Sequence, residues 1–406
     1  MEVVPSGVRN LFRAALIIFV ITVVIGILNG TDVWDPPHST LLTHVHAGTL
    51  GWITLSVFAA TIWMFGDSSD PSSGRLATFS IVAMSLYVFA FWSGDIFNTT
   101  ESIQRPIGGT LAFIAIVWMT VWVFRQKKGE SYNVAEFGMA LAILFLLLGA
   151  ILGVLLGLQL ADVQVVSGEA GTRLGDAHPA AMVIGYVVLA MLAILEWRFR
   201  GSDGPTLGEA KPGVVQMVLM FLAGLFGMLG LLLDIQGLLM ISTPFQVIGL
   251  VIFLWRMRKD LAPSQWAGDM SGVFLRTAAL GLVVAVVFTA IVVNKFIALG
   301  DDTSDEAFEA ILPYLLALDH TTFILVVTNV IFGLLAVSSV VSEASNKIIY
   351  YGVNIGAVGF IVGLVGENST LKRIFTPILG LTILYGIYMH LVTKPAMSTK
   401  ESAAAT

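Results

Sequence analysis

The stretch that decides the fold is Thr43–Trp52, which reads THVHAGTLGW. It places two histidines two residues apart inside a long apolar run and follows them with small residues. An ionisable or metal-binding side chain inside a membrane span is costly, so histidines in such a run predict a functional site. The composition of the chain and its other apolar segments indicate whether this stretch lies in a membrane.

The composition is that of a membrane protein. The 406 residues are 57% hydrophobic and 12% charged, with a mean hydropathy of +0.89, whereas soluble domains usually carry about 25% charged residues. The chain contains no cysteine, which excludes disulfides, thiolate metal sites and the cysteines to which a c-type haem is attached. It has no phosphate-binding loop motif and no basic patch, so membrane lipid rather than nucleic acid is the expected environment.

Twelve segments are long and apolar enough to cross a membrane, which takes about 20 mostly apolar residues as a helix. We therefore predict an all-α integral membrane protein with one membrane domain over 1–406. The expected spans are roughly 11–30, 40–65, 76–94, 106–124, 134–160, 176–198, 213–233, 238–257, 274–299, 311–339, 347–366 and 372–393.

Lysine and arginine predict the orientation of these spans. Most of the 21 basic residues lie at the N-terminus, at the C-terminus or in alternate loops, whereas the acidic runs Asp32–Asp35 and Asp301–Glu309 lie in the other loops. Both termini are therefore expected in the cytoplasm, and a prokaryotic plasma membrane is the expected location.

An internal repeat relates the histidines. When His44 is aligned with His178, a glycine seven residues later matches, an aromatic residue eight later matches, and Trp63 matches Trp197. His320 marks a weaker third copy, in which Thr328 and Asn329 stand near the aromatic position. The three copies, at about 8–130, 131–260 and 270–395, predict three four-helix arcs in a pseudo-threefold bundle.

The spacing of the histidines suggests that one helix serves two sites. Residues two apart on an α-helix point about 200° from one another, so His44 and His46 face opposite sides and cannot bind one ion together. Neutral imidazole is a ligand for iron, copper and zinc, and in an apolar pocket without cysteine the natural large ligand is haem.

The segment HVHAGTLGW resembles the His-x-His helix of the catalytic subunit (subunit I) of the haem-copper oxidase and nitric-oxide reductase superfamily, particularly its cbb-type branch. The resemblance is specific around Thr43–Trp52 and looser around Asp176–Tyr186, and twelve spans in three arcs match that subunit's layout. It implies that His44, His46, His178 and His320 bind one or two b-type haems through the haem iron. It also implies a cytochrome c-type electron donor subunit as a partner.

Two pairings follow from the resemblance. In the first, which we favour, His46 and His178 hold a low-spin haem while His44 and His320 face a second site. In the second, His46 or His44 pairs with His320, and His178 stands where a copper ligand stands in the oxidases. The family's copper site uses three histidines, two of them adjacent after the sixth span, and the segment 213–233 has none. A complete copper site and dioxygen reduction of the usual kind are therefore not expected.

The expected function is electron transfer or oxidoreduction, or a response to nitric oxide or oxygen. A twelve-span transporter or metal carrier that uses the histidines as ion ligands is the alternative, and a structural or sensory partner subunit is a third. Some further residues have weaker interpretations. Arg105, Arg173 and Lys295 are candidate partners of haem propionates, Asp319 caps a polar seam, His38 and His390 are non-ligands, and Glu196 is an anchor at the membrane surface.

Overall fold

The computed structural model describes residues 4–66, 70–96, 104–161, 163, 169–299 and 304–393. Within these residues, twelve helices are long and apolar enough to cross a membrane. The prediction of an all-α protein with twelve spans is confirmed, and the observed helix ends lie within a few residues of the predicted ones. Helices satisfy every backbone hydrogen bond internally, which a lipid environment demands.

Single α-helices form nine of the described spans, and they surround the others. These helices are α1 (Ser6–Gly30), α4 (Pro71–Ile96), α5 (Gln104–Gln126), α6 (Val134–Leu160), α9 (Lys211–Leu233), α10 (Gln236–Met257), α11 (Met270–Leu299), α14 (Glu343–Val365) and α15 (Ser369–Val392).

The second, sixth and tenth spans are interrupted by a π-helical segment. They consist of α2 (His38–His46), η1 (Ala47–Thr54) and α3 (Leu55–Phe65); of α7 (Glu169–Ala180), η2 (Ala181–Val187) and α8 (Val188–Arg200); and of α12 (Asp305–His320), η4 (Thr321–Thr328) and α13 (Asn329–Ser338). Each of the four histidines singled out by the sequence lies in the α-helix before a π-helical segment.

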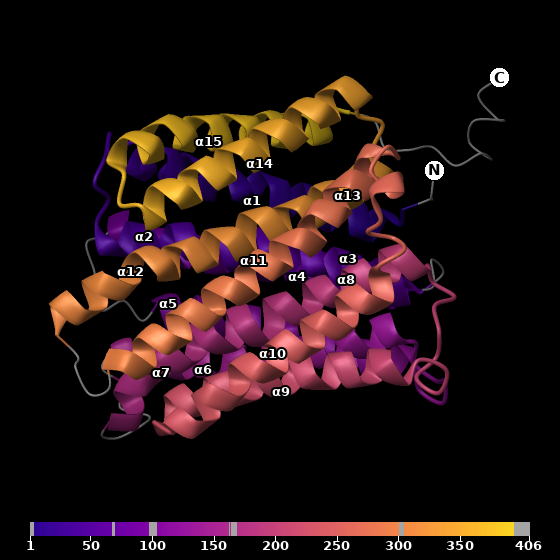
Figure 1. Cartoon of the computed structure of the whole chain (residues 1–406), viewed down its shortest axis with the longest axis horizontal. Helices are drawn as coiled ribbons and strands as arrows, with labels where there is room; N and C mark the ends of the chain where they lie inside the picture. Colours follow the sequence, from indigo (N-terminus) through magenta and orange to yellow (C-terminus); the bar gives the residue numbers. More distant parts are fainter. Residues whose placement is uncertain are drawn as a thin grey trace.

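The three interrupted spans are the inner helices of the bundle. In their most apolar windows 89%, 83% and 78% of the residues are buried, against 28–50% in the windows of the other spans. In Figure 1 the helices run side by side, with α14 and α15 next to α1 along one edge and α9 and α10 along the opposite edge. An even number of crossings returns a chain to the side on which it began. The described spans number twelve, and α1 accordingly begins at the end of the bundle where α15 ends (Figure 1).

The core lies where the inner helices meet. Every residue is buried from Leu50 to Phe65, from Gly185 to Trp197 and from Leu325 to Leu335. Trp63 and Trp197, which the repeat matches in the sequence, pack edge to face with ring centroids 5.4 Å apart. The repeated residues of the first two copies therefore contact each other at the centre of the protein.

Glycines bring α14 and α15 close together, as their spacing predicts. A side chain on Gly356 would stand 2.6 Å from the backbone nitrogen of Leu379, and one on Gly363 would stand 2.8 Å from that of Lys372. These two helices therefore touch backbone to backbone.

Glu196 is not an anchor at the membrane surface. It is 1% exposed, and its carboxylate accepts two hydrogen bonds from the guanidinium of Arg256, at 2.5 and 2.8 Å. Arg256 also donates to Gln216 at 2.7 Å. The interpretation from the sequence was wrong because the adjacent Trp197 and Arg198 suggested an interface, whereas α8 is surrounded by other helices.

Candidate functional site

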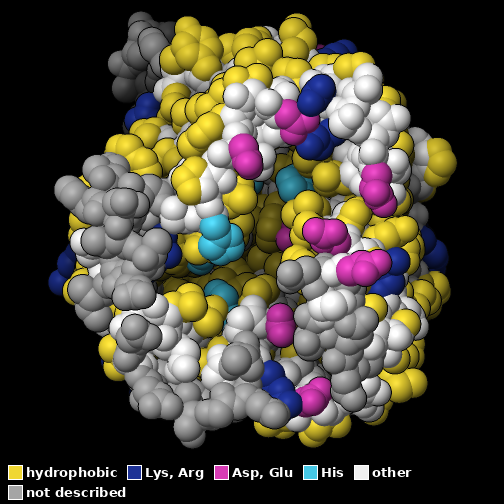
Figure 2. All heavy atoms as spheres, turned by 90° about the vertical axis from the view of Figure 1, so that its left-hand side faces the viewer, with side chains coloured by type: hydrophobic (Ala, Val, Ile, Leu, Met, Phe, Trp, Pro, Cys, Tyr) yellow, Lys and Arg dark blue, Asp and Glu magenta, His cyan; other side chains and the backbone are white. Residues whose placement is uncertain are grey.

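A hollow opens at the end of the bundle where the inner helices begin. Figure 2 looks onto this end and shows histidine side chains within a hollow whose deeper wall is hydrophobic. His44, His46, His178 and His320 are each half-buried, although the inner helices become fully buried a few residues later. Val45 is 46% exposed on one of the three most buried spans, so the hollow reaches the helix between His44 and His46.

His44 and His46 lie on opposite sides of α2, as the helical geometry predicts. The Nδ1 atom of His44 is 2.8 Å from the carbonyl oxygen of Thr22 on α1. The ring of His46 instead stacks on Phe91 of α4, with centroids 4.0 Å apart and an angle of 25° between the rings. One helix thus presents a histidine to each of two neighbouring spaces.

His178 has the same surroundings as His44. Its Nδ1 atom is 2.9 Å from the carbonyl oxygen of Gly149 on α6, and α6 precedes α7 just as α1 precedes α2. A side chain on Gly153, one turn after Gly149, would meet the His178 ring at 2.7 Å. One on Gly26, one turn after Thr22, would meet the His44 ring at 3.1 Å.

His320 instead has the surroundings of His46. The Nδ1 atom of each is 2.7 Å from the carbonyl oxygen of a leucine one turn earlier on the same helix, Leu316 and Leu42 respectively. The His320 ring packs against Phe360 of α14 with centroids 4.9 Å apart, as that of His46 packs against Phe91 of α4.

The turns that follow His320 also match those that follow His46. The π-helical segment begins immediately after His46 and immediately after His320. It ends in each case at a threonine, Thr54 or Thr328, whose hydroxyl donates to the carbonyl five residues earlier. His320 therefore has the surroundings of His46 rather than those of His44. The aromatic residues find no match in this register either, because Trp52 and Trp63 would stand opposite Val326 and Val337.

The hydrogen bonds of the four histidines fix their protonation. A carbonyl oxygen can only accept, so Nδ1 carries the hydrogen in each neutral ring and Nε2 is left with its lone pair. A histidine that binds a metal through Nε2 donates its other ring N–H to a carbonyl or carboxylate in this way. In all four side chains Nε2 is thus the ring nitrogen that could bind a metal.

Two pairs of these rings lie near enough that a charge on one would act on the other. His44 lies near His320, and His46 lies near both His178 and Arg105. No pair was certain from the sequence, because the distance between helices far apart in the chain cannot be obtained from residue spacing.

Arg105 lies at the edge of the space beside His46. Its guanidinium stands over the ring of Phe91, 5.2 Å from the centroid, and Phe91 in turn stacks on His46. Its Nε and Nη2 atoms are buried without a hydrogen-bond partner among the described residues, as is Oε1 of Gln159 on α6. A buried guanidinium without a partner is costly, so this position suits an anionic group.

Of the other candidate contacts to an anionic group, Arg173 is already paired with an acidic residue. Arg173 forms an ion pair with Asp234 at 2.9 Å, and the ammonium of Lys295 stands 4.4 Å from the ring centroid of Tyr314. His38 is exposed at the start of α2, and Asp319 is half-buried beside His320. Arg105 and Lys295 thus both lack an acidic partner among the described residues, and of these two Arg105 is the one near His46.

The residues that position the histidines were not found from the sequence. Thr22, Gly26, Phe91 and Phe360 carry no motif. A leucine stands one turn before His46, His178 and His320 alike, so it does not distinguish the two kinds of surroundings.

Among the residues that the structure describes, no three histidine, aspartate or glutamate side chains come together as a metal-binding group. A haem needs fewer protein ligands than a bare metal ion does. The porphyrin supplies four nitrogen donors, and the chain adds one or two ligands. Comparisons with protein-family models and with curated protein sequences gave no match to this chain.

Proposed function

We propose that this chain is a haem-binding integral membrane protein of the haem-copper oxidase type. The observation that carries the proposal is the hydrogen bond from Nδ1 to a backbone carbonyl at His44, His46, His178 and His320. In each ring this bond leaves Nε2 as the atom that can bind a metal, which is the arrangement found at nearly all metal-binding histidines.

The three inner helices, in this proposal, belong to three four-helix arcs around a pseudo-threefold axis, and a space lies between each pair of neighbouring arcs. One space has His46, which bonds to its own helix, on one side and His178, which bonds to the preceding span, on the other. A second space has His320 and His44 in the same roles. The third has Ala180 and Leu318 at the corresponding positions, and Leu318 packs against Ala285 and Val292 of α11.

This arrangement favours the first of the two pairings, with one haem b between His46 and His178 and a second between His44 and His320. The support is that His44 lies near His320 and His46 lies near His178. The space beside His46 and His178 has the stronger support, because Arg105 lies next to it with an uncompensated charge. A guanidinium grips a carboxylate bidentately, so Arg105 would hold a propionate of this haem.

A bound haem would supply one-electron redox chemistry, and where only one histidine of a pair binds the iron it would also leave a binding site for a small gas. The chain itself holds the axial rings in one orientation, surrounds them with apolar side chains and keeps one cationic partner for the propionates. Electron transfer or oxidoreduction, or a response to nitric oxide or oxygen, is the function that these features suit best. An electron donor would be a cytochrome c-type partner subunit.

The proposal places the hollow at the outer face of a prokaryotic plasma membrane and both termini in the cytoplasm. The support is the alternation of basic residues between the two sets of loops. The hollow lies at the end of the bundle away from the start of α1 and the end of α15 (Figures 1 and 2).

The test is the absorption spectrum of the full-length protein, purified in detergent from haem-replete cells. We expect a Soret band, with one spectral component lost in both His46→Ala and His178→Ala and a second lost in both His44→Ala and His320→Ala. His38→Ala is the matched control, because His38 is exposed at the start of the same helix as His44 and His46, and it should keep the full spectrum.

A colourless preparation would overturn the proposal. If the same spectral component is lost in His46→Ala and in His320→Ala, while His178→Ala leaves the spectrum unchanged, the second pairing is supported instead. Uptake of a transition-metal ion into vesicles by the colourless protein would support the metal carrier.

A further inference from the structure

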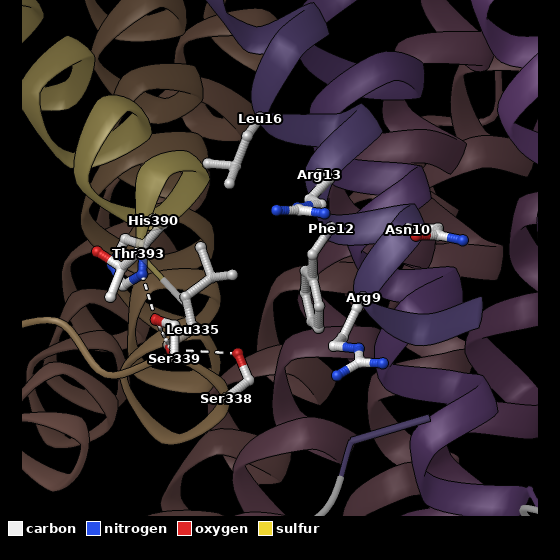
Figure 3. A pocket seen from close by; sticks show the side chains of 10 residues that line it. All are labelled: Arg9, Asn10, Phe12, Arg13, Leu16, Leu335, Ser338, Ser339, His390 and Thr393. Atoms are coloured by element: carbon white, nitrogen blue, oxygen red, sulfur yellow. Dashed lines mark hydrogen bonds between the residues drawn. The ribbon is translucent and has the colours of Figure 1, made fainter. Parts of the chain in front are cut away.

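A second site lies at the opposite end of the bundle from the histidine hollow. A cavity of about 200 Å³ opens between the start of α1 and the ends of α13 and α15, and Figure 3 shows its lining side chains. They are Arg9, Asn10, Phe12, Arg13, Leu16, Leu335, Ser338, Ser339, His390 and Thr393. Among the described residues, the lining contains three basic side chains and no acidic one.

Two guanidiniums form one side of this cavity. Arg9 and Arg13 are four residues apart on α1, so they lie on the same face of the helix, and Figure 3 shows both on the side opposite Ser339 and His390. Within the described part of the chain, neither has a hydrogen-bond or ion-pair partner. Two uncompensated cations one turn apart attract an anion and do not stabilise the bundle by themselves.

His390 forms the other side, and it has one unused nitrogen. It is 5% exposed, and its Nδ1 atom is 2.7 Å from the hydroxyl oxygen of Ser339. The Ser339 hydroxyl donates its hydrogen to the carbonyl of Leu335 at 2.8 Å, so Nδ1 must be the donor to Ser339. The Nε2 atom of His390 is buried and has no hydrogen-bond partner among the described residues.

The geometry points to a binding site for a phosphate group between Arg9, Arg13 and His390. Guanidiniums recognise phosphate oxygens bidentately, and Nε2 can accept from a phosphate hydroxyl or, when protonated, donate to a phosphate oxygen. Basic groups on two sides of the cavity match a tetrahedral oxyanion better than a planar carboxylate. The cavity of about 200 Å³ has several times the roughly 30 Å³ that a water occupies in the liquid, so a phosphate group fits.

The phosphate has two available sources, the headgroup of an anionic lipid and the free ion, and two measurements distinguish them. The first is the thermal unfolding midpoint of the purified full-length protein in detergent, with potassium phosphate against potassium chloride at equal ionic strength and pH. The second is native mass spectrometry after incubation with phosphatidylglycerol or with phosphatidylcholine. Saturable binding of inorganic phosphate supports the free ion as ligand, and retention of phosphatidylglycerol alone supports the headgroup.

The variants that test the assignment are Arg9→Gln/Arg13→Gln and, as a matched control, Arg125→Gln. Arg125 is exposed in the last turn of α5 and lies outside the cavity, so this change removes charge without touching the site. We expect the double variant to weaken binding at least about tenfold, and Arg125→Gln to bind as the wild type does. If the double variant does not fold, Arg13→Gln alone replaces it, since Arg13 is exposed.

Two results would overturn the assignment. One is that neither phosphate nor phosphatidylglycerol binds the wild-type protein. The other is that Arg125→Gln loses as much binding as the cavity variants, which would indicate a general attraction of anions to this end of the protein. Neither result depends on whether haem is bound at the other end.

Discussion

His178 lies directly against Gly153: a side chain added at this glycine would stand 2.7 Å from Cε1 of the imidazole ring. The ring occupies this space while its Nδ1 atom donates to the carbonyl of Gly149, one turn earlier on α6. The two glycines therefore fix both the position and the protonation of a proposed haem ligand.

The first prediction concerns this contact. Gly153→Ala should push the His178 ring away from the Gly149 carbonyl, because a contact below 3 Å cannot be kept. Loss of such an orienting hydrogen bond typically weakens metal affinity about 10- to 100-fold, and haem retention on dilution, followed at the Soret band, measures it. Gly157→Ala is the control, since its new side chain would meet Pro106 at an ordinary 3.7 Å. Equal retention in both variants would speak against the role of His178.

A second prediction follows from the uncompensated charge of Arg105. Arg105→Gln should lower haem retention at least about tenfold, since charge-assisted hydrogen bonds to a carboxylate are strong. Arg105→Lys should recover only part of it, because an ammonium lacks the planar fork. Arg173→Gln should leave haem retention unchanged, since Arg173 pairs with Asp234. Wild-type retention in Arg105→Gln would remove Arg105 from the site.

The third prediction tests the buried ion pair of Glu196 and Arg256. Removing one partner of such a pair leaves a buried charge, so Glu196→Gln should lower the free energy of unfolding by about 3–5 kcal/mol. The double variant Glu196→Gln/Arg256→Gln should be less destabilised than this single variant. Denaturant unfolding followed by circular dichroism measures both.

The control for this prediction is Glu343→Gln, which breaks the ion pair with Lys347 at the start of α14. Both side chains of that pair are exposed, so its loss should have a much smaller effect. Equal losses in Glu196→Gln and Glu343→Gln would contradict the assigned burial.

A fourth prediction concerns pH. Asp32, after α1, accepts hydrogen bonds from Lys372 at 3.0 Å and Arg373 at 2.7 Å at the start of α15. These two hydrogen bonds lower the pKa of the Asp32 carboxyl below its ordinary value of 3.8, and the bond from Lys372 has the larger effect. A lowered pKa in the folded state means stability that is present above the unfolded pKa and is lost as the pH falls through the folded pKa.

The measurement is the thermal unfolding midpoint of the wild type and of Asp32→Asn between pH 7 and pH 3. The wild type should be the more stable at neutral pH, and the difference should shrink below about pH 4. Residue 32 has a left-handed backbone conformation with a φ of 55°, which asparagine adopts as readily as aspartate does. The substitution therefore removes the charge without straining the backbone. Asp35→Asn, which removes a carboxylate from the same loop and leaves this contact in place, is the control. A difference that stays constant with pH would mean that the carboxylate charge is not what stabilises this contact.

The sequence by itself determined the twelve spans and the opposite directions of His44 and His46. Both are local properties: a run of about 20 apolar residues must cross the membrane as a helix, and 3.6 residues per turn fix which side chains share a face. The match between Trp63 and Trp197 was likewise visible in the sequence, and the structure brings these two residues into contact.

Only the tertiary structure decided which histidines are equivalent, which carbonyls fix their protonation, and which charges are left without a partner. His44 and His178 bond to the preceding span of their units, while His46 and His320 bond to their own helices. Arg105 and Arg173 looked alike in the sequence, yet only Arg173 has an acidic partner in the described residues. These properties depend on distances between helices that are remote in the chain, and residue spacing within one helix carries no information about such distances.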